Sequence, residues 1–301
     1  MLLFLINYYF CIKMMKIIEN KGSYRSLSQI FTPSIFKEVV KSTDYTKLNY
    51  RIEKHLRDFK KNDYNSVLEF LYNKLEKNYR NEYLFKNALL NKKLLGTYSL
   101  KTTTILNEFK IGSSIADLVL LNGEVRVFEI KTDLDGFDKL EKQINDYKKF
   151  ADKIYIVVSK NNSSKIEKLY SETNIGIIEF TKSNTLKTIK EAVSDKNYFE
   201  HLTIFKTLRK NEYLEILVSY FGFTPNVPNT QIFKDSFDLI KQLDINTFQN
   251  LAFQKLKERK IKCPEILESE LIPNELKHLC YTLNFSHKEY DNLFKFLKTK
   301  V

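Results

Sequence analysis

The sequence predicts an α/β fold with a central mixed sheet, helices flanking the sheet, and further helical regions at both ends of the chain. Between residues 62 and 95, apolar residues recur at spacings of three and four, as on one face of a helix. From residue 105 onward the apolar residues gather instead in short runs with strand character, and helical segments separate the later runs. This alternation is typical of a sheet covered by helices.

The individual elements follow in chain order. Segment 62–95 is expected to form one long helix or two consecutive helices that end at Gly96, a residue type favoured just after a helix. Strands are expected at 105–111, 115–121, 124–131, 153–159 and 175–180, and helices at 137–151 and 163–172. Asn122-Gly123 marks a tight hairpin between the second and third strands. Both of these strands are apolar on both faces, which predicts central positions in the sheet.

Three regions are expected along the chain. Residues 1–75 form an N-terminal helical region, 76–190 the α/β core, and 191–301 a C-terminal helical domain. From about residue 189 the pattern is helical, and Ser286 with Glu289 has the spacing of a capping box before a helix.

Composition and charge indicate a globular protein with an acidic partner. The chain has 301 residues, 43% of them hydrophobic, and only 7 Gly and 5 Pro, which argues against long disordered segments. The formal net charge of +12 suits a polyanion partner such as nucleic acid or an acidic membrane surface. A lysine-rich globular protein without a nucleic-acid partner is the alternative.

The cysteines favour a reducing compartment. Cys11, Cys263 and Cys280 are widely spaced and form no CxxC pair, so a disulfide framework is not expected and the cytoplasm is the default. A zinc ion bound by Cys263, His278, Cys280 and His287 is a weaker hypothesis, because the usual paired spacings are absent.

The chain opens with the apolar run MLLFLINYYFCI. Twelve residues are too few for a helix to cross about 30 Å of hydrocarbon, and no basic residue precedes the run as in a signal peptide. No membrane partner is therefore expected. Translation from Met14 or Met15 would leave up to fourteen residues, 1–14, outside the native protein, and an amphipathic element packed on the core is the alternative.

Two acidic residues stand in the most apolar strands. Asp117 lies in the second strand and Glu129 in the third, and burying both charges without partners would cost several kcal/mol. Either an ion pair with Lys131 or a divalent metal ion can compensate them. Carboxylates together with a backbone carbonyl, here that of Ile130, are ligands that Mg²⁺ accepts. Lys131 shares a strand face with Glu129 and can orient an attacking water or stabilise charge on phosphate.

This site sets a condition on the hairpin. A two-residue loop would pair Leu121 with Glu124 and place Asp117 and Glu129 on opposite faces of the sheet. The hypothesis therefore predicts an odd-length turn or a bulge around residues 121–124.

The Glu-x-Lys pattern alone carries little information, because it occurs at Glu19, Glu108, Glu129, Glu258 and Glu275. Only at Glu129 does it combine a strand, an upstream Asp on a paired strand, a Gly turn and a following helix.

That following helix carries further candidates. Gln143 and Tyr147 share one face, where they are expected to contact a DNA phosphate or base beside the metal. Lys139 and Lys142 are expected to attract the phosphate backbone. A solvated helix face explains these lysines equally well.

Asp117, Glu129-Ile130-Lys131 and Gln143-Ile-Asn-Asp-Tyr147 resemble the motifs of the PD-(D/E)XK nuclease superfamily, in particular its RecB-like branch with a QxxxY helix. The resemblance covers roughly residues 76–180. Two departures are Ala116, where the family usually has Pro, and the lack of an assignable metal-binding His upstream. The longer pattern also resembles a family of stand-alone bacterial nuclease-like proteins.

The resemblance implies a restriction-endonuclease-like core that uses Mg²⁺ or Mn²⁺. It implies that Asp117, Glu129 and the Ile130 carbonyl hold the metal and that Lys131 lies beside the attacking water. Glu82, in YRNEYLFKN, matches the acidic position on the helix before the sheet; a solvated carboxylate paired with Arg80 or Lys86 is its alternative. Glu108 and Lys110 form a rival Glu-x-Lys pair, expected to be accessory.

The expected function is metal-dependent hydrolysis of DNA phosphodiester bonds by in-line attack of water, in a role such as defence against foreign DNA. Cleavage of RNA by the same site is one alternative. A catalytically silent module that binds nucleic acid or a partner protein is another, because fold does not fix function. The C-terminal helical domain is the expected surface for a homodimer or a partner protein.

Overall fold

A computed structural model describes residues 16–17, 23–57 and 62–301, and in it the chain divides into two units. The first unit contains residues 1–96 and 261–301, and the second contains residues 97–260. The predictions for the apolar run at 1–14 fall outside the described residues. No helix in the described part of the chain has both the length and the apolar character that a membrane span requires.

The first unit is helical, with one small two-stranded sheet. Its N-terminal elements are β1 (Lys16–Ile17), α2 (Ser23–Ser28), α3 (Pro33–Lys37), the π-helix η1 (Glu38–Ser42), α4 (Thr46–His55), β2 (Leu56–Arg57), α5 (Tyr64–Asn78), α6 (Glu82–Ala88) and the π-helix η2 (Leu89–Leu95). Its C-terminal elements are α13 (Pro264–Glu268), the short 3₁₀ helix η3 (Asn274–Leu276), α14 (Lys277–Leu283) and α15 (His287–Lys298).

The predicted helical segment 62–95 forms consecutive helices. The side chain of Asp63 accepts a hydrogen bond from the backbone N–H of Ser66 at 2.8 Å and starts α5. Tyr79 leaves the helical conformation, and the side chain of Asn81 then caps α6. The segment therefore does not form one continuous helix, because α5 ends before Tyr79 and Asn81 starts α6.

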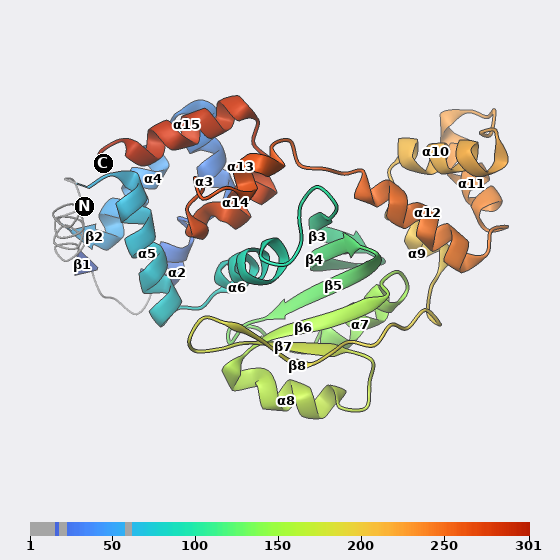
Figure 1. The fold of residues 1–301 in the computed structure, drawn as a ribbon, viewed down its shortest axis with the longest axis horizontal. Coiled ribbons are helices and arrows are strands. Elements are labelled where there is room, and N and C mark those ends of the chain that lie inside the picture. Colours follow the sequence, from blue (N-terminus) through green and yellow to red (C-terminus); the bar gives the residue numbers. More distant parts are fainter. Residues whose placement is uncertain (1–15, 18–22, 58–61) are drawn as a thin grey trace. The chain divides into compact units, whose positions relative to one another are not determined.

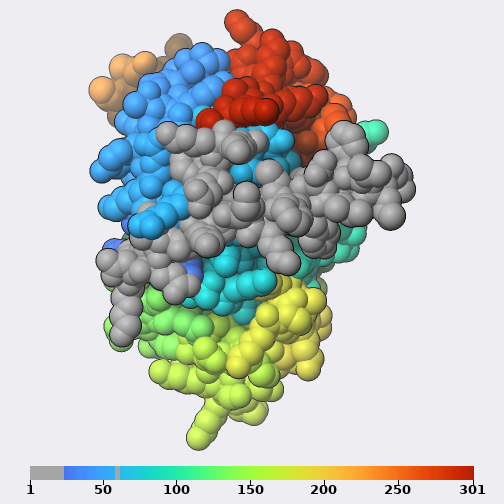
Figure 2. Space-filling view, turned by 90° about the vertical axis from the view of Figure 1, so that its left-hand side faces the viewer, coloured from blue at the N-terminus to red at the C-terminus, as the bar shows by residue number. Residues whose placement is uncertain are grey.

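The two ends of the chain pack together in this unit. Helix α15 lies against η1 and α5, and α14 lies against α3, as Figure 1 shows for the red and blue segments. The Nδ2 of Asn292 donates to the carbonyl of Val40 at 3.0 Å, and the backbone N–H of Tyr64 donates to the carbonyl of Thr299 at 3.1 Å. In the space-filling view, the C-terminal residues accordingly lie beside the blue N-terminal helices (Figure 2).

The second unit is built on a six-stranded mixed sheet in the order β3-β4-β5-β6-β7-β8, which confirms the predicted fold class. The strands are β3 (Thr104–Ile111), β4 (Ser114–Asn122), β5 (Glu124–Lys131), β6 (Lys153–Ser159), β7 (Gly176–Phe180) and β8 (Leu186–Lys190). The helices are α7 (Leu140–Lys148), α8 (Lys160–Tyr170), α9 (His201–Phe205), α10 (Lys210–Phe221), α11 (Asn229–Ile240) and α12 (Ile245–Lys257). Strand β6 is parallel to β5 and β7, and the other neighbouring pairs are antiparallel.

The hairpin between β4 and β5 has an odd-length turn, as predicted. Asn122 pairs with Glu124, so a single residue, Gly123, forms the turn, with a φ of 69°. The ladder continues to the pair Leu118 and Phe128. Extending this register places position 117 opposite position 129, on one face of the sheet.

Helix α7 covers the face of the sheet on which these positions lie. Leu140, Ile144 and Tyr147 of α7 belong to the same buried cluster as Val119 of β4 and Val127 of β5. Helix α8 packs against β6 and β7 as the second crossover helix (Figure 1).

Helices α9 to α12 also belong to the second unit. The Oγ1 of Thr104 donates to the carbonyl of Lys257 at 2.7 Å, and the Nε2 of Gln249 donates to the buried carboxylate of Asp152 at 3.2 Å. These bonds attach α12 to β3 and to the start of β6.

The observed division differs from the three regions expected from the sequence. The expected C-terminal helical domain is shared between the units, because α9–α12 pack with the sheet whereas α13–α15 return to the N-terminal helices. Strand β8, at 186–190, was not predicted, and the helical pattern was expected to begin at about residue 189. Its residues LKTIK are largely half-buried, as at the edge of a sheet.

Candidate active site

Glu129 and Lys131 form a buried ion pair on the face covered by α7. Their side chains project from alternate positions of β5, and the Lys131 Nζ lies 2.9 Å from the Glu129 Oε1. Glu129 is 2% exposed and Lys131 is 9% exposed. The predicted ion pair is therefore present and almost fully removed from water.

Gln143 of α7 bridges this pair. Its Nε2 donates to the Glu129 Oε1 at 2.5 Å, and its Oε1 accepts from the Lys131 Nζ at 2.9 Å. The single amide therefore holds both members of the pair, which fixes their orientation as well as satisfying their charges.

Tyr147 donates a hydrogen bond to the other carboxylate oxygen of Glu129. Its hydroxyl lies 2.7 Å from the Glu129 Oε2 and 2.9 Å from the carbonyl oxygen of Ile115. Burial, followed by the charge of Glu129 and the hydrogen bond to it and then the charge of Asp117, raises the pKa of Tyr147 far above its usual value, so the phenol stays protonated as a donor.

This geometry corrects the expected role of the helix face. Tyr147 is 0% exposed, so it cannot contact DNA directly as the sequence suggested. The amide of Gln143 is directed at Glu129 and Lys131. Both residues hydrogen-bond to the ion pair, a contact that the i and i+4 spacing alone did not predict. Gln143 is half-buried, and its contact with DNA stays a prediction.

Asp117 lies where the β4–β5 ladder ends. Its Oδ2 accepts a hydrogen bond from the backbone N–H of Ile130 at 2.7 Å, so a side chain replaces the main-chain partner on β4. The last paired residues are Leu118 and Phe128. Asp117 is half-buried and close enough for its charge to affect Tyr147. Its carboxylate is therefore held beside the residue between Glu129 and Lys131.

Glu108 lies next to Asp117 on the neighbouring strand. Asn107 pairs with Leu118 and Phe109 pairs with Ala116, which leaves Glu108 opposite Asp117. Carboxylate oxygens of Glu108 and Asp117 lie within 4.8 Å of each other. Glu108 has a φ of 48°, a left-handed conformation that is uncommon for a residue other than glycine and often found at functional sites.

The prediction for Glu108 as accessory understated this proximity. The signal that places it opposite Asp117 is the register of β3 on β4, which follows from the hairpin after Ile111 and not from the Glu-x-Lys pattern. Its partner in that pattern, Lys110, pairs across the ladder with Ile115.

Asp146 attaches α7 to the β3–β4 turn. Its Oδ2 accepts from the hydroxyls of Ser113 and Ser114 at 2.8 and 2.7 Å and from the backbone N–H of Ser113 at 3.2 Å. Burial tends to raise the pKa of Asp146, but these hydrogen bonds outweigh it and the net shift is downward. A Cβ on Gly112 would lie 2.8 Å from the Asp146 carboxylate, so the turn requires glycine there. These hydrogen bonds position the face of α7 that carries Gln143 and Tyr147.

The remaining predicted residues lie at the starts of two helices, α7 and α6. Lys139 and Lys142 are exposed at the start of α7, where an anion from solvent can reach them. Glu82 belongs to the first unit, as the first residue of α6, and its carboxylate pairs with Lys86 at 2.5 Å. This pair is the alternative that the sequence offered for Glu82.

The donor set fits a hard divalent cation. Asp117 and Glu108 offer carboxylate oxygens within 4.8 Å of each other, and the peptide of Ile130 adjoins Asp117. Oxygen-only ligands of this kind suit Mg²⁺ or Mn²⁺. Both oxygens of Glu129 accept hydrogen bonds within the protein, so Glu129 would have to exchange a partner in order to bind metal.

Comparison with known proteins identifies a family. A family model described as Bacteriophage P4 protein cII matches residues 75–280, more than half of the chain. The chain belongs to this family. The matched region includes α6, the whole sheet and the residues of the candidate site.

The relatives are distant. Protein cII of Enterobacteria phage P4 is 27% identical over 186 residues, which cover 59% of this chain and 64% of the phage protein. A periplasmic chaperone PpiD from Buchnera aphidicola subsp. Schizaphis graminum is 27% identical over 179 residues, 58% of this chain and 28% of the chaperone. The matched region therefore spans less than two thirds of either relative.

A solved structure also matches in part. It is a protein of unknown function from Silicibacter pomeroyi, 13% identical, with a TM-score of 0.27 over 40% of this chain and 80% of that one. A likeness at that score supports no argument about fold or function.

Proposed function

We propose that this protein is a metal-dependent nuclease that hydrolyses phosphodiester bonds of DNA. The observation that supports this proposal best is that Asp117 of β4 lies close to Glu129 and Lys131 of β5. Asp117 bonds to the peptide between Glu129 and Lys131, and the hairpin register places positions 117 and 129 on one face. An acidic pair with an adjacent ammonium group is the arrangement that the PD-(D/E)XK resemblance implies.

The residues of the site have different proposed roles in metal binding and charge stabilisation. A bound Mg²⁺ or Mn²⁺ would supply Lewis acidity toward a phosphate oxygen and its bound water. Asp117 and the Ile130 carbonyl are the proposed ligands, with Glu108 beside Asp117 and with Glu129 once it releases a hydrogen-bond partner. Lys131 places positive charge where the negative charge of the phosphate increases in the transition state.

The reaction is a hydrolysis. The oxygen of one water forms a bond to phosphorus, and the bond from phosphorus to the leaving sugar oxygen breaks on the opposite side. The water loses a proton to solvent, and the leaving oxygen gains one. Gln143 and Tyr147 maintain the positions of Glu129 and Lys131 while the charges change.

The test compares cleavage by the full chain and by variants of the site. Linear duplex, circular duplex, single-stranded DNA and RNA are each incubated with Mg²⁺, Mn²⁺ or EDTA. Cleavage by the unmodified protein should require the metal, and Lys131→Met should reduce the rate on the order of 10² to 10³-fold. Digestion of linear but not circular duplex would indicate a requirement for DNA ends.

Matched controls separate chemistry from folding. Lys196→Met removes the partner of another buried carboxylate in the same unit, since the Lys196 Nζ lies 3.3 Å from Asp152, and it should retain cleavage. Asp117→Asn keeps the acceptor for the Ile130 N–H and should fold but not cleave. If no substrate is cut by the folded protein and all variants bind DNA equally, the chain is instead a binding module. Cutting of RNA alone would change the substrate and leave the site in place.

A further inference from the structure

We propose that Cys263, Glu265 and His287 bind one Zn²⁺ ion in the first unit. The three residues are far from the candidate active site in sequence, and the inference does not depend on the proposed nuclease function. A ligand atom of each residue lies within 4.8 Å of a ligand atom of the other two.

The distance between Cys263 and His287 is close to the one that a shared metal ion requires. The Cys263 Sγ lies 3.3 Å from the His287 Nδ1, and the His287 Nε2 lies 3.3 Å from the Glu265 Oε1. With Zn–S and Zn–N bonds of about 2.3 and 2.0 Å at a tetrahedral angle, the sulfur and nitrogen are about 3.5 Å apart. The Glu265 Oε1 lies beside the other ring nitrogen, Nε2, so Glu265, whose side chain is 58% exposed, must change its side-chain conformation to reach an ion held by the Cys263 Sγ and the His287 Nδ1.

The types of ligand select zinc over the ion proposed for the sheet. A thiolate and an imidazole are borderline-soft donors, which suit Zn²⁺ and disfavour Mg²⁺. Three protein ligands leave one position for water, and the exposed His287, with 75% of its side chain accessible, lets an ion enter from solvent. Cys263 forms the buried wall of the site at 2% exposure.

The local fold already holds the two helix starts together. Cys263 precedes Pro264, the first residue of α13, and His287 is the first residue of α15. The backbone N–H of Lys262 donates to the Oδ1 of Asn284 at 2.7 Å, which connects the two segments just before the ligands. The capping box of Ser286 fixes the start of α15. Little chain ordering is therefore left for the ion to impose.

The cluster contains two of the four zinc ligands that the sequence suggested. Cys263 and His287 come together, and Glu265 joins them in place of another cysteine. His278 and Cys280 are buried in α14, and neither belongs to a group of three or more potential ligands within the described residues.

Metal binding by the full chain in the Asp117→Asn background tests this proposal, because that variant weakens the carboxylate site on the sheet. The protein is stripped with a chelator and titrated with Zn²⁺ by calorimetry and with Co²⁺ by absorption. One Zn²⁺ should bind per chain, and Co²⁺ should produce a thiolate-to-metal charge-transfer band. Cys263→Ser should remove that band and weaken binding at least about tenfold, and Glu265→Gln should weaken it less.

Cys280→Ala is the matched control, since it removes the other described cysteine of the same unit and should leave the band unchanged. Thermal unfolding with and without Zn²⁺ adds a second measurement: Zn²⁺ should raise the midpoint of the chelator-stripped Asp117→Asn protein but not that of the variant that also carries Cys263→Ser and His287→Ala. Equal Zn²⁺ affinity in that variant, or no binding by the stripped protein, would overturn the proposal.

Discussion

At the scale of single residues, Glu129 explains how a carboxylate can be buried in the sheet. Its two oxygens accept hydrogen bonds from Lys131, Gln143 and Tyr147. Breaking a buried pair by removing one partner is far more destabilising than the net contribution of an exposed pair, because the remaining charge is left without compensation. The network therefore fixes Glu129 in one orientation, which is the property that a catalytic site requires.

Tyr147→Phe tests this positioning role. The change removes one donor to Glu129 and keeps the ring, so the free energy of unfolding should fall by about 1.5–3 kcal/mol, as for a hydrogen bond to a charged group. The proposed nuclease activity should fall as well, because the carboxylate gains freedom to rotate. Urea unfolding measures the first effect and DNA cleavage the second.

Tyr213→Phe is the control, because this buried tyrosine of α10 has its pKa raised by burial alone and packs on the ring of Phe205. Its effect on stability should be smaller, and its effect on cleavage absent. Equal losses of stability in both variants would show that the hydroxyl of Tyr147 does not hold Glu129.

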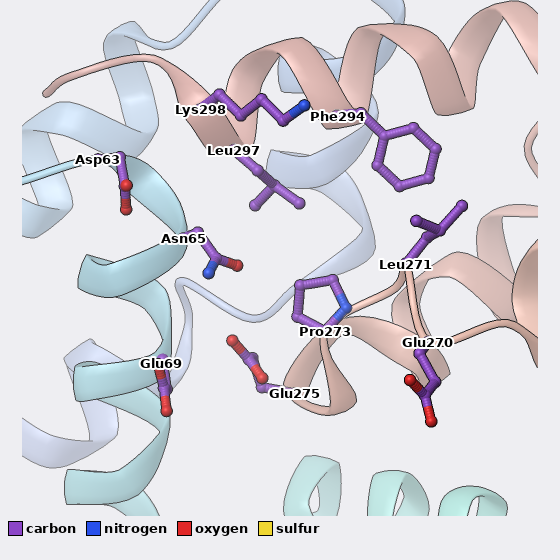
Figure 3. A pocket seen from close by; sticks show the side chains of 10 residues that line it. All are labelled: Asp63, Asn65, Glu69, Glu270, Leu271, Pro273, Glu275, Phe294, Leu297 and Lys298. Atoms are coloured by element: carbon purple, nitrogen blue, oxygen red, sulfur yellow. The ribbon is translucent and has the colours of Figure 1, made fainter. Parts of the chain in front are cut away.

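Glu275 leads to a prediction about pH in the first unit. It lines a cavity of about 560 Å³ together with Asp63, Glu69 and Glu270 (Figure 3). Burial raises the pKa of Glu275 to about 7, and the charge of Glu69 adds to the increase. The unfolded chain loses this proton near pH 4.5, so the free energy of unfolding should decrease between pH 4.5 and 7 by on the order of 3 kcal/mol.

Glu275→Gln should remove this dependence. The variant should be more stable than the unmodified protein at pH 8 and similar to it at pH 4, in chemical unfolding followed at both values. Glu270→Gln changes an exposed residue of the same cavity and should leave the pH profile unchanged. A profile that Glu275→Gln does not flatten would place the pKa of Glu275 near its ordinary value.

The sequence predicted which charged residues of β4 and β5 lie together but not the contacts of the residues around them. Asp117, Glu129 and Lys131 were selected because charges in apolar strands need partners, and the structure brings them together. Glu108 was ranked lower, because its approach to Asp117 depends on the register of a third strand. Tyr147 was expected to contact DNA, because helical spacing shows which side chains share a face and not how deeply that face is buried.

At the scale of elements, the alternation of side chains along β4 and β5 predicted the length of the turn between them. The requirement that Asp117 and Glu129 share a face predicted an odd-length turn, and the pairing of Asn122 with Glu124 confirms it. The five predicted strands agree with the observed ones to within one residue at each end. Strand β8 was missed, because its residues alternate lysine with short or apolar residues and form no apolar run.

Gly123 leads to a prediction at this scale. Its φ of 69° lies in a region that residues with a Cβ rarely adopt, and no atom lies near a Cβ built there. Gly123→Ala should therefore reduce the free energy of unfolding by about 1 kcal/mol through backbone strain alone. Gly136→Ala is the control, because Gly136 has no left-handed φ, and thermal unfolding should show a smaller change. An unchanged stability of Gly123→Ala would contradict the left-handed conformation of the one-residue turn.

At the scale of the whole molecule, the division of the chain depends on long-range packing. Residues 261–301 leave the sheet unit and pack with the N-terminal helices, through bonds such as that from Asn292 to Val40. Helical periodicity is the same on both sides of residue 260, so the sequence indicates helices there but not their partners. The net charge of +12, unlike the packing partners of the helices, follows from the composition alone and is therefore known from the sequence.

This charge predicts salt-dependent binding to DNA. If Lys139 and Lys142 contact phosphates, Lys139→Ala with Lys142→Ala should weaken binding equally for all sequences. The slope of log K against log salt should then become shallower by about 1.8, since each phosphate contact contributes about 0.9. Fluorescence anisotropy with a labelled duplex at several salt concentrations measures both quantities.

Lys206→Ala with Lys234→Ala is the control, because these lysines are exposed in the same unit, after α9 and on α11, and the change in net charge is identical. If net charge alone attracts DNA, both double variants should change affinity and slope alike. If the start of α7 is the contact surface, only the first variant should change the slope, because only direct contacts release counterions from the duplex. A slope that stays the same in the first variant while cleavage persists would move the DNA path away from α7 and leave the ion pair of Glu129 and Lys131 to be approached from another side.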